Sequence, residues 1–182
     1  MKIDGMRGLT LLELLFVIVI MTLLFGFVSQ GVDLVRRERV ASATQELYSD
    51  IQKARVDAMT RDGKGFGIRL ASHGSYVIFK FNDCNSDSNY DIDTCANGTR
   101  EETDMVKREL HPSVMLCKMN PSIEVNNDVR VFDRFGVPRR SSGGLGPITI
   151  YVKNDQSIGP IRCVTISTNR IREGTWNGSE CI

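Results

Sequence analysis

The stretch MRGLTLLELLFVIVIMTLLFGF, residues 6–27, decides how the rest of the chain is organised. Residues 9–28 carry a single charged side chain, that of Glu13. A helix of about 20 residues can cross a hydrocarbon core of about 30 Å, so we expect a membrane-spanning helix here. A cleavable secretory signal is the competing interpretation. Such signals have an apolar region of about 7 to 15 residues and a small-residue cleavage site. The sequence FGFV at residues 25–28 does not offer such a site.

Glu13 is the unexpected residue in this run. A carboxylate within a bilayer costs on the order of 2.5–3.5 kcal/mol at mid-span and less near a helix end, and it usually has a partner. One interpretation is that Glu13 reaches the headgroups from the end of the helix. The other is that Glu13 pairs with a cation inside an assembly, because a buried carboxylate is tolerated when it is paired.

The residues around Glu13, RGLTLLELLFVIVI at positions 7–20, closely resemble the N-terminal signature of type IV prepilins and type II secretion pseudopilins. That signature is a short basic leader ending in glycine, then an apolar residue, threonine, two apolar residues and glutamate. The resemblance implies that prepilin peptidase cuts after Gly8 and that Leu9 becomes an N-methylated N-terminus. It also implies that Glu13 pairs with the N-terminal amine of a neighbouring subunit. Leu9 departs from the phenylalanine usual in the family, and the proline common in the middle of major pilin helices is absent.

After residue 30 the chain becomes charged but keeps a helical pattern. Apolar residues recur at spacings of 3 and 4, which predicts one stripe along a helix: Val40, Ala43, Leu47, Ile51, Ala54 and Ala58. We expect this stripe to pack on a sheet, with a coiled coil as the alternative. The expected organisation is a leader at residues 1–8, a membrane and filament-core helix at 9–30, its amphipathic continuation at 31–62, and a β-rich head at 63–182.

From residue 66 onward the pattern changes to strands. Six segments are rich in β-branched and aromatic residues and are separated by Gly, Pro, Asn and Ser: FGIRLA, SYVIFKFN, SVMLCKM, VRVFDRFG, PITIYVK and IRCVTIST. They predict an α+β fold in which an antiparallel sheet covers the second half of the long helix. This arrangement resembles the pilin fold. Within the family, VFDRFGVPRR and RCVTISTNRIREGTW resemble the head of the minor pilins and H-type pseudopilins.

The cysteines point to an oxidising compartment. They form no CxxC pair and no zinc-ligand spacing, which favours disulfides: Cys84, Cys95, Cys117, Cys163 and Cys181. Together with the length of the downstream domain, this predicts a single-pass inner-membrane protein with a cytoplasmic N-terminus and a periplasmic head. Cys84 with Cys95 is the first expected bridge and Cys163 with Cys181 the second, which leaves Cys117 as a thiol. Sequence alone does not choose among the pairings.

The most acidic segment is NDCNSDSNYDIDTCANGTREE at residues 82–102. Asp83, Asn85 and Asp87 place oxygen atoms at alternate positions, as the first three ligands of a calcium loop do. Ser88 stands where the turn glycine is expected, and Thr94 stands where a closing glutamate is expected. The segment is therefore either a calcium loop or a solvated loop closed by a disulfide, and we expect no other cofactor.

Charge and motifs leave little room for catalysis or nucleic-acid binding. The net charge of +1, from 23 basic and 22 acidic residues, gives no global attraction to an anionic partner. A local basic patch could contact a neighbouring subunit or DNA, or could simply protect a strand edge: Arg134, Arg139, Arg140, Arg170 and Arg172. No GxSxG, HExxH or glycine-rich phosphate loop is present, and His73 and His111 lie in turn-like sequences. We therefore expect neither an enzyme nor a nucleic-acid-binding protein.

Two hypotheses follow. In the first, the chain is a minor pilin or H-type pseudopilin of a type IV pilus or a type II secretion pseudopilus. Its partners are then other subunits, prepilin peptidase and the inner-membrane assembly platform. In the second, it is a periplasmic binding module or enzyme that keeps its membrane anchor permanently, and a DNA-binding minor pilin is a further alternative. The two differ in whether the leader is removed.

Overall fold

The structure is a computed structural model that describes residues 10–60, 64–82, 102–118, 121–123, 125–140, 144–157 and 159–182. It divides into two compact units, Met1–Val35 and Arg36–Ile182. Some residues singled out in the sequence lie outside the described ranges: Gly8, Leu9, Asp83, Cys84, Asn85, Asp87 and Cys95. Their cleavage, disulfide and calcium roles therefore stay predictions.

One long helix, α1, runs from Leu11 to Thr60. Its 50 residues correspond to about 75 Å at a rise of 1.5 Å per residue. The expected long N-terminal helix is therefore confirmed. Its residues up to Val35 belong to the first unit, and those from Arg36 belong to the second.

The strands of the second unit form two antiparallel sheets. The first contains β1 to β3, β5 and β6, in the order β3-β2-β1-β5-β6, and the second has the order β4-β7-β8-β9. The bounds are β1 Lys64–Ser72, β2 Ser75–Asn82, β3 Glu102–Glu109, β4 Val114–Lys118, β5 Asp128–Phe132, β6 Pro138–Arg140, β7 Ile148–Asn154, β8 Arg162–Ile166 and β9 Ile171–Thr175. The antiparallel prediction is confirmed, but the strands form two sheets rather than one.

The split into two sheets occurs after β3. The chain turns at Pro112 and Ser113, and β4 then pairs with β7, with Val114 opposite Asn154, instead of adding to β3. This pairing joins segments about 40 residues apart. The periodicity of either segment carries no information about which partner it takes.

The sequence pattern did not predict three of the strands, β3, β6 and β9. β3 (ETDMVKRE) and β9 (IREGT) are charged edge strands, and β6 (PRR) has three residues. An edge strand is commonly blunted by charged side chains, so it lacks the apolar alternation by which a central strand is found. These strands could not be separated from loops by composition.

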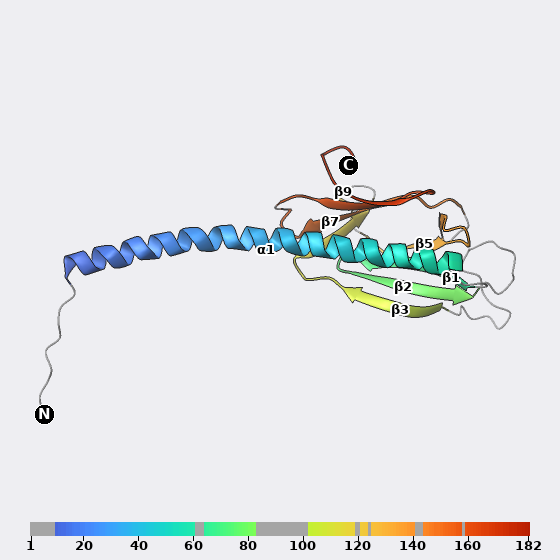
Figure 1. Ribbon diagram of the computed structural model, residues 1–182, viewed down its shortest axis with the longest axis horizontal. Coiled ribbons are helices and arrows are strands. Elements are labelled where there is room, and N and C mark those ends of the chain that lie inside the picture. The colour runs from blue at the N-terminus through green and yellow to red at the C-terminus, as the bar shows by residue number, and fades with distance from the viewer. Residues whose placement is uncertain are drawn as a thin grey trace, which may run out of the picture. The chain divides into compact units, whose positions relative to one another are not determined.

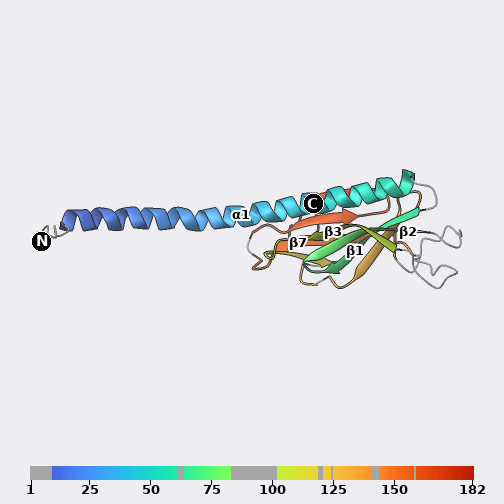
Figure 2. The same ribbon diagram turned by 90° about the horizontal axis from the view of Figure 1, so that it is seen from below.

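The core lies between α1 and both sheets. The second half of α1 crosses the strands in Figure 1 and lies along one side of them in Figure 2. The predicted stripe is buried there at Val40, Leu47, Ile51, Ala54 and Ala58, with Ala43 partly buried against the same core. The strands contribute aromatic and aliphatic side chains from both sheets: Phe66, Ile68, Leu70, Tyr76, Phe132, Leu116, Ile150, Val164 and Ile166. The packing prediction is confirmed, and the coiled-coil alternative is wrong for this part of the helix.

Each sheet also has apolar residues on its other face. A second cluster joins Val77, Phe79, Phe81 and Val131 of the first sheet. A third joins residues of β4, β7 and β8 to the C-terminal segment that follows β9: Cys117, Tyr151, Cys163, Ile161, Trp176 and Cys181. The C-terminal segment therefore covers the outer face of the second sheet.

Candidate functional site

The first turn of α1 is capped by its own sequence. The hydroxyl of Thr10 accepts a hydrogen bond from the backbone N–H of Glu13 at 3.3 Å, and the Thr10 carbonyl accepts one from Leu14 N–H at 3.1 Å. The spacing Thr-x-x-Glu is that of a capping box. It also places a carboxylate in the first turn, where the helix dipole favours negative charge. This cap was not among the predicted features, although the spacing between Thr10 and Glu13 is the pattern that predicts it.

The first unit exposes an apolar helix surface. From Leu11 to Phe25, the large apolar side chains are between 46% and 83% exposed. They surround the helix instead of forming one stripe, so burial in the core of a soluble domain does not account for them. Within the described residues, α1 is the helix that is long and apolar enough to span a membrane, by length and composition.

Two polar side chains interrupt this surface. The hydroxyl of Thr22 donates to the carbonyl of Val19 at 2.8 Å, so its hydrogen-bonding capacity is used inside the helix. Glu13 is the only ionisable residue between Leu11 and Phe25, and its side chain is exposed. A helix with this surface can enter lipid or pack among other apolar helices, and Glu13 is then the group that needs a cation.

The structure decides one of the two predicted disulfides. Cys163 and Cys181 form a bridge with their Cα atoms 6.1 Å apart, as predicted. Cys117 is a buried thiol, also as predicted. Within the described residues there is no group of three or more His, Cys, Asp or Glu side chains that could hold a metal ion. The acidic segment lies largely outside those residues, so its calcium role stays a prediction.

The predicted basic residues do not act as one group. Arg139 donates through Nε to the Asp133 carboxylate at 2.9 Å, so its charge is largely neutralised. The Arg134 guanidinium lies 4.8 Å from the centre of the Phe135 ring. Arg170 is exposed next to the β8–β9 turn. A phosphate backbone is bound by several converging cations, whereas Arg134 and Arg139 are each engaged in a separate local contact.

A polar network fastens α1 to the first sheet. The Asp50 carboxylate accepts from the Tyr76 hydroxyl and from Arg108 Nε, each at 3.0 Å, and Glu46 lies 3.1 Å from Arg108. Burial, together with the charge of Asp50, raises the pKa of the Tyr76 hydroxyl above its ordinary value of 10.0. The hydrogen bond with Asp50 raises the pKa of Arg108 as well. The network therefore joins α1 to β2 and β3 through Tyr76 and Arg108.

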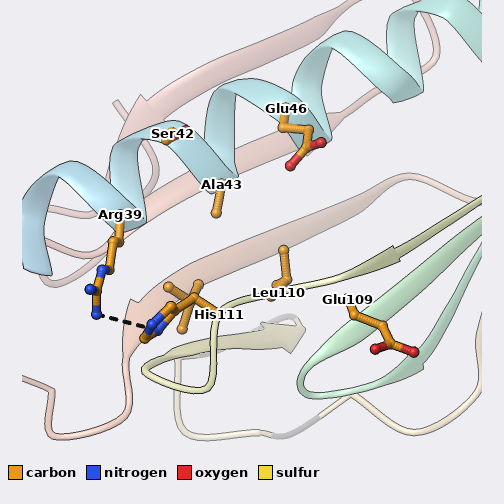
Figure 3. Close-up of a pocket in the computed structure, with 8 residues that line it drawn as sticks. Arg39, Ser42, Ala43, Glu46, Glu109, Leu110 and His111 are labelled. Carbon is orange, nitrogen blue, oxygen red and sulfur yellow. Dashed lines mark hydrogen bonds between the residues drawn. The ribbon is translucent and has the colours of Figure 1, made fainter.

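Beside this network, α1 and the β3–β4 region border an open pocket of about 200 Å³, shown in Figure 3. Its lining comes from the helix (Arg39, Ser42, Ala43, Glu46), from the connection (Leu110, His111), and from the adjoining ends of β3 (Glu109) and β4 (Val114). Apolar side chains line part of it, and Arg39 Nη1 lies 3.4 Å from His111 Nδ1 at one end.

The two histidines lie in turns, as predicted. His111 Nδ1 accepts from the backbone N–H of Ser113 at 3.2 Å and lies 2.8 Å from its hydroxyl, which fixes the imidazole in its turn. His73 lies in the turn between β1 and β2. His111 is therefore held by its own turn at one end of the pocket.

No protein-family model and no curated protein matches the sequence. The chain is similar to the solved structure of the minor pseudopilin EpsH from the type II secretion system of Vibrio cholerae, with 14% identity and a TM-score of 0.48. That match covers 80% of this chain and 99% of EpsH. The chain is also similar to the type IV minor pilin FimU of Pseudomonas aeruginosa PAO1, with 16% identity and a TM-score of 0.47 over 82% of this chain and 96% of FimU. At this level the likeness concerns the arrangement of the helix and sheets alone.

Proposed function

We propose that this chain is a minor pilin or pseudopilin subunit, inserted in the inner membrane and then assembled into a type IV pilus or a type II secretion pseudopilus. The role is structural and not catalytic. One observation carries the proposal. A helix that is apolar on every side from Leu11 to Phe25 has a single carboxylate, Glu13, in its first turn.

A permanent anchor has no need for that carboxylate, whereas a filament core does. In the proposal, prepilin peptidase removes residues 1–8, and the new amine of Leu9 supplies the cation that Glu13 of a neighbouring subunit requires. Pairing two charges in an apolar environment offsets part of the cost of burying each, and it fixes the relative position of the two helices. The residues 7–20 match the family signature at each position that this step needs, apart from the leucine at position 9.

In this proposal the head stays in the periplasm. The disulfide between Cys163 and Cys181 supports it, because structural disulfides persist in oxidising compartments. The head then contacts neighbouring subunits, while the apolar helices bundle in the filament core. The H-type pseudopilin group is the finer assignment, and it depends on the segments VFDRFGVPRR and RCVTISTNRIREGTW.

Mass spectrometry of the full chain purified from its native membrane tests the proposal. The expected N-terminus is Leu9 carrying one methyl group, and deleting prepilin peptidase should restore a chain that begins at Met1. A Gly8→Ala variant offers a matched control. It replaces the residue that precedes the cleaved bond and leaves the sequence of the helix unchanged. An intact Met1 in the wild-type strain would instead support the permanently anchored module and reject the subunit.

A further inference from the structure

Three arginines follow the apolar stretch of α1 within about one turn of the helix. They are Arg36, Arg37 and Arg39, and are called the arginine cluster below. Arg37 and Arg39 are exposed, and Arg36 is partly buried. Arg36 follows the end of the predicted span, residue 28, by eight residues, or about 12 Å of helix. The cluster is therefore the first dense group of charges after the apolar part of the chain.

The cluster lies on the side of α1 that carries the head. Successive residues of an α-helix are about 100° apart, which puts the three arginines about 40° to 100° from the buried Val40. Glu38 is about 160° from Val40 on the same count. The one carboxylate within residues 36–39 therefore faces away from the core of the head.

Two of these arginines contact the β7–β8 connection. Arg36 Nη1 donates to Gln156 Oε1 at 3.0 Å. A Cβ built on Gly159 would lie 3.4 Å from Arg37 Cγ and 3.8 Å from Arg37 Nε. The acid of this connection, Asp155, accepts from the backbone N–H of Gln156 at 2.9 Å. An amide oxygen and a glycine carry no negative charge, so these two contacts position the arginines without neutralising them.

Arg39 contacts the β3–β4 connection. Its Nη1 lies 3.4 Å from His111 Nδ1, as Figure 3 shows. Nδ1 also accepts from the backbone N–H of Ser113 at 3.2 Å, so the neutral ring carries its proton on Nε2 and can donate from there. Arg39 and His111 are exposed and border the open pocket, so an anion can approach both from solvent.

The two connections form one end of the head. The backbone N–H of Asp155 donates to the carbonyl of Ser113 at 3.0 Å, which joins the end of β7 to the β3–β4 connection. The whole arginine cluster therefore contacts a single end of the second unit.

The chemistry of the cluster fits phosphate. A guanidinium group is a planar fork that binds two oxygen atoms of a phosphate at once, and all three cations are arginine. Basic residues close to a membrane span are ordinarily concentrated on the cytoplasmic side. The proposed function puts this cluster on the exported side, against that bias, where the phosphates within its reach belong to lipid headgroups.

We propose that the arginine cluster binds the phosphate groups of anionic phospholipids on the periplasmic surface of the inner membrane. This inference rests on the proposed function, because that function exports the head. Reach along the helix favours lipid over an acidic protein. The headgroup layer is about 5 to 7 Å thick on each side, and an arginine side chain points back towards the N-terminus of its helix. The contact holds the head at the membrane until the subunit enters the filament.

Native mass spectrometry of the full chain in detergent micelles tests the proposal. The chain is purified from its native membrane and titrated with phosphatidylglycerol, which is anionic, or with phosphatidylcholine, which has no net charge. Phosphatidylglycerol should bind preferentially, and added salt should reduce that preference because the contact is electrostatic. Arg37→Gln/Arg39→Gln should weaken phosphatidylglycerol binding about thirtyfold, at about fivefold for each arginine removed.

Arg172→Gln is the matched control, since it removes an exposed arginine on β9 and should leave lipid binding unchanged. Equal binding of the two lipids would leave an acidic protein surface as the occupant and overturn the proposal. Unchanged binding in Arg37→Gln/Arg39→Gln, or an equal loss in Arg172→Gln, would also overturn it. The N-terminal leader is the same in every variant, so the comparison does not depend on cleavage. Failure of the proposed function would be seen separately, as an intact mass that includes Met1 in the same spectra.

Discussion

Glu13 combines two roles at one residue. Its backbone N–H completes the Thr10 cap at 3.3 Å, and its carboxylate lies in the first turn of an apolar helix. The first role contributes about 1 kcal/mol to helix stability and depends on Thr10. The second, the proposed pairing with the N-terminal amine of a neighbouring subunit, depends on the charge of Glu13 alone. The two roles can therefore be separated by substitution.

Glu13→Gln keeps the size of the side chain and removes the charge. We expect this variant to be cleaved normally but to enter filaments at least about tenfold less than wild type, because an unpaired ammonium would remain in the apolar core. Filament incorporation is measured by immunoblotting of sheared or overproduced filaments, with N-terminal processing followed by mass spectrometry. Thr10→Ala is the matched control that weakens the cap and retains the charge. Equal incorporation of Glu13→Gln and wild type would rule out the registration role.

Tyr76 is a second residue whose environment makes a measurable prediction. It is fully buried, and its hydroxyl donates to Asp50 at 3.0 Å. The pKa of Tyr76 is raised in the folded state, so this stabilising contribution is fully present below the unfolded pKa of about 10 and is lost as pH rises above it.

Tyr76→Phe should lower the free energy of unfolding by about 1 kcal/mol at pH 7, because one hydrogen bond to Asp50 is lost. Between pH 9.5 and 11 the stability of the variant should fall less steeply than that of wild type. Urea unfolding at a series of pH values measures both effects. Parallel pH dependences for the two proteins would show that Tyr76 does not keep its proton in the folded state.

At the scale of the elements, the C-terminal segment is held to the second sheet in three ways. Thr175 and Ile182 exchange backbone hydrogen bonds of 2.7 and 3.0 Å, and Cys181 is joined to Cys163 on β8. Tyr151 and Trp176 add an edge-to-face contact with ring centres 5.1 Å apart. The segment is thus an integral part of the sheet.

The Cys163→Ala/Cys181→Ala double variant should lower the free energy of unfolding by about 2–4 kcal/mol, because the unfolded chain loses a covalent loop constraint. Urea unfolding measures the change, and limited proteolysis should show faster cleavage after residue 176. A stability loss below about 0.5 kcal/mol would mean that the hydrogen bonds and the ring contact already suffice.

Close approach between strands makes Gly67 a sensitive position in β1. A Cβ there would lie 2.7 Å from the Arg130 carbonyl oxygen on β5 and 2.7 Å from the Phe79 ring on β2. Gly67→Ala should therefore destabilise the head by about 1–3 kcal/mol through overpacking. Gly74→Ala is the matched control, since no atom lies within 4 Å of its added Cβ, and it should have little effect on the urea midpoint. Equal midpoints for both variants would contradict the close approach.

At the scale of the whole molecule, the two units differ in the surfaces that they expose. The first unit exposes apolar side chains from Leu11 to Phe25, whereas the second unit contains the clustered core of α1 and both sheets. A unit with its own hydrophobic core can fold by itself, and an exposed apolar helix is soluble only in lipid, in detergent or among other helices.

A fragment of residues 36–182 should therefore be soluble without detergent and unfold cooperatively in urea, while the full chain should require detergent. Size-exclusion chromatography and circular dichroism measure these properties. Residues 40–58 must be retained, because their apolar stripe is part of the core. A fragment that precipitates or lacks a cooperative transition would show that the head depends on the N-terminal half of the helix.

Several structural features of this protein could be predicted from local sequence. The existence of one long helix, the buried stripe from Val40 to Ala58, and the place of Glu13 in an apolar run all follow from spacing along one helix. Helical and strand periodicities are local properties, so one sequence is sufficient to read them. The central strands were found for the same reason.

Only the tertiary structure decided the features that join distant segments. It separated the strands into two sheets, selected Cys163 and Cys181 from the open pairings, and revealed the charged edge strands β3 and β9. It also showed that Arg139 forms an ion pair with Asp133 and that Phe135 is exposed in the β5–β6 turn. Each depends on which segments meet after the chain has closed long loops. Because that choice is set by packing and burial between distant residues, it leaves no periodic pattern in the sequence.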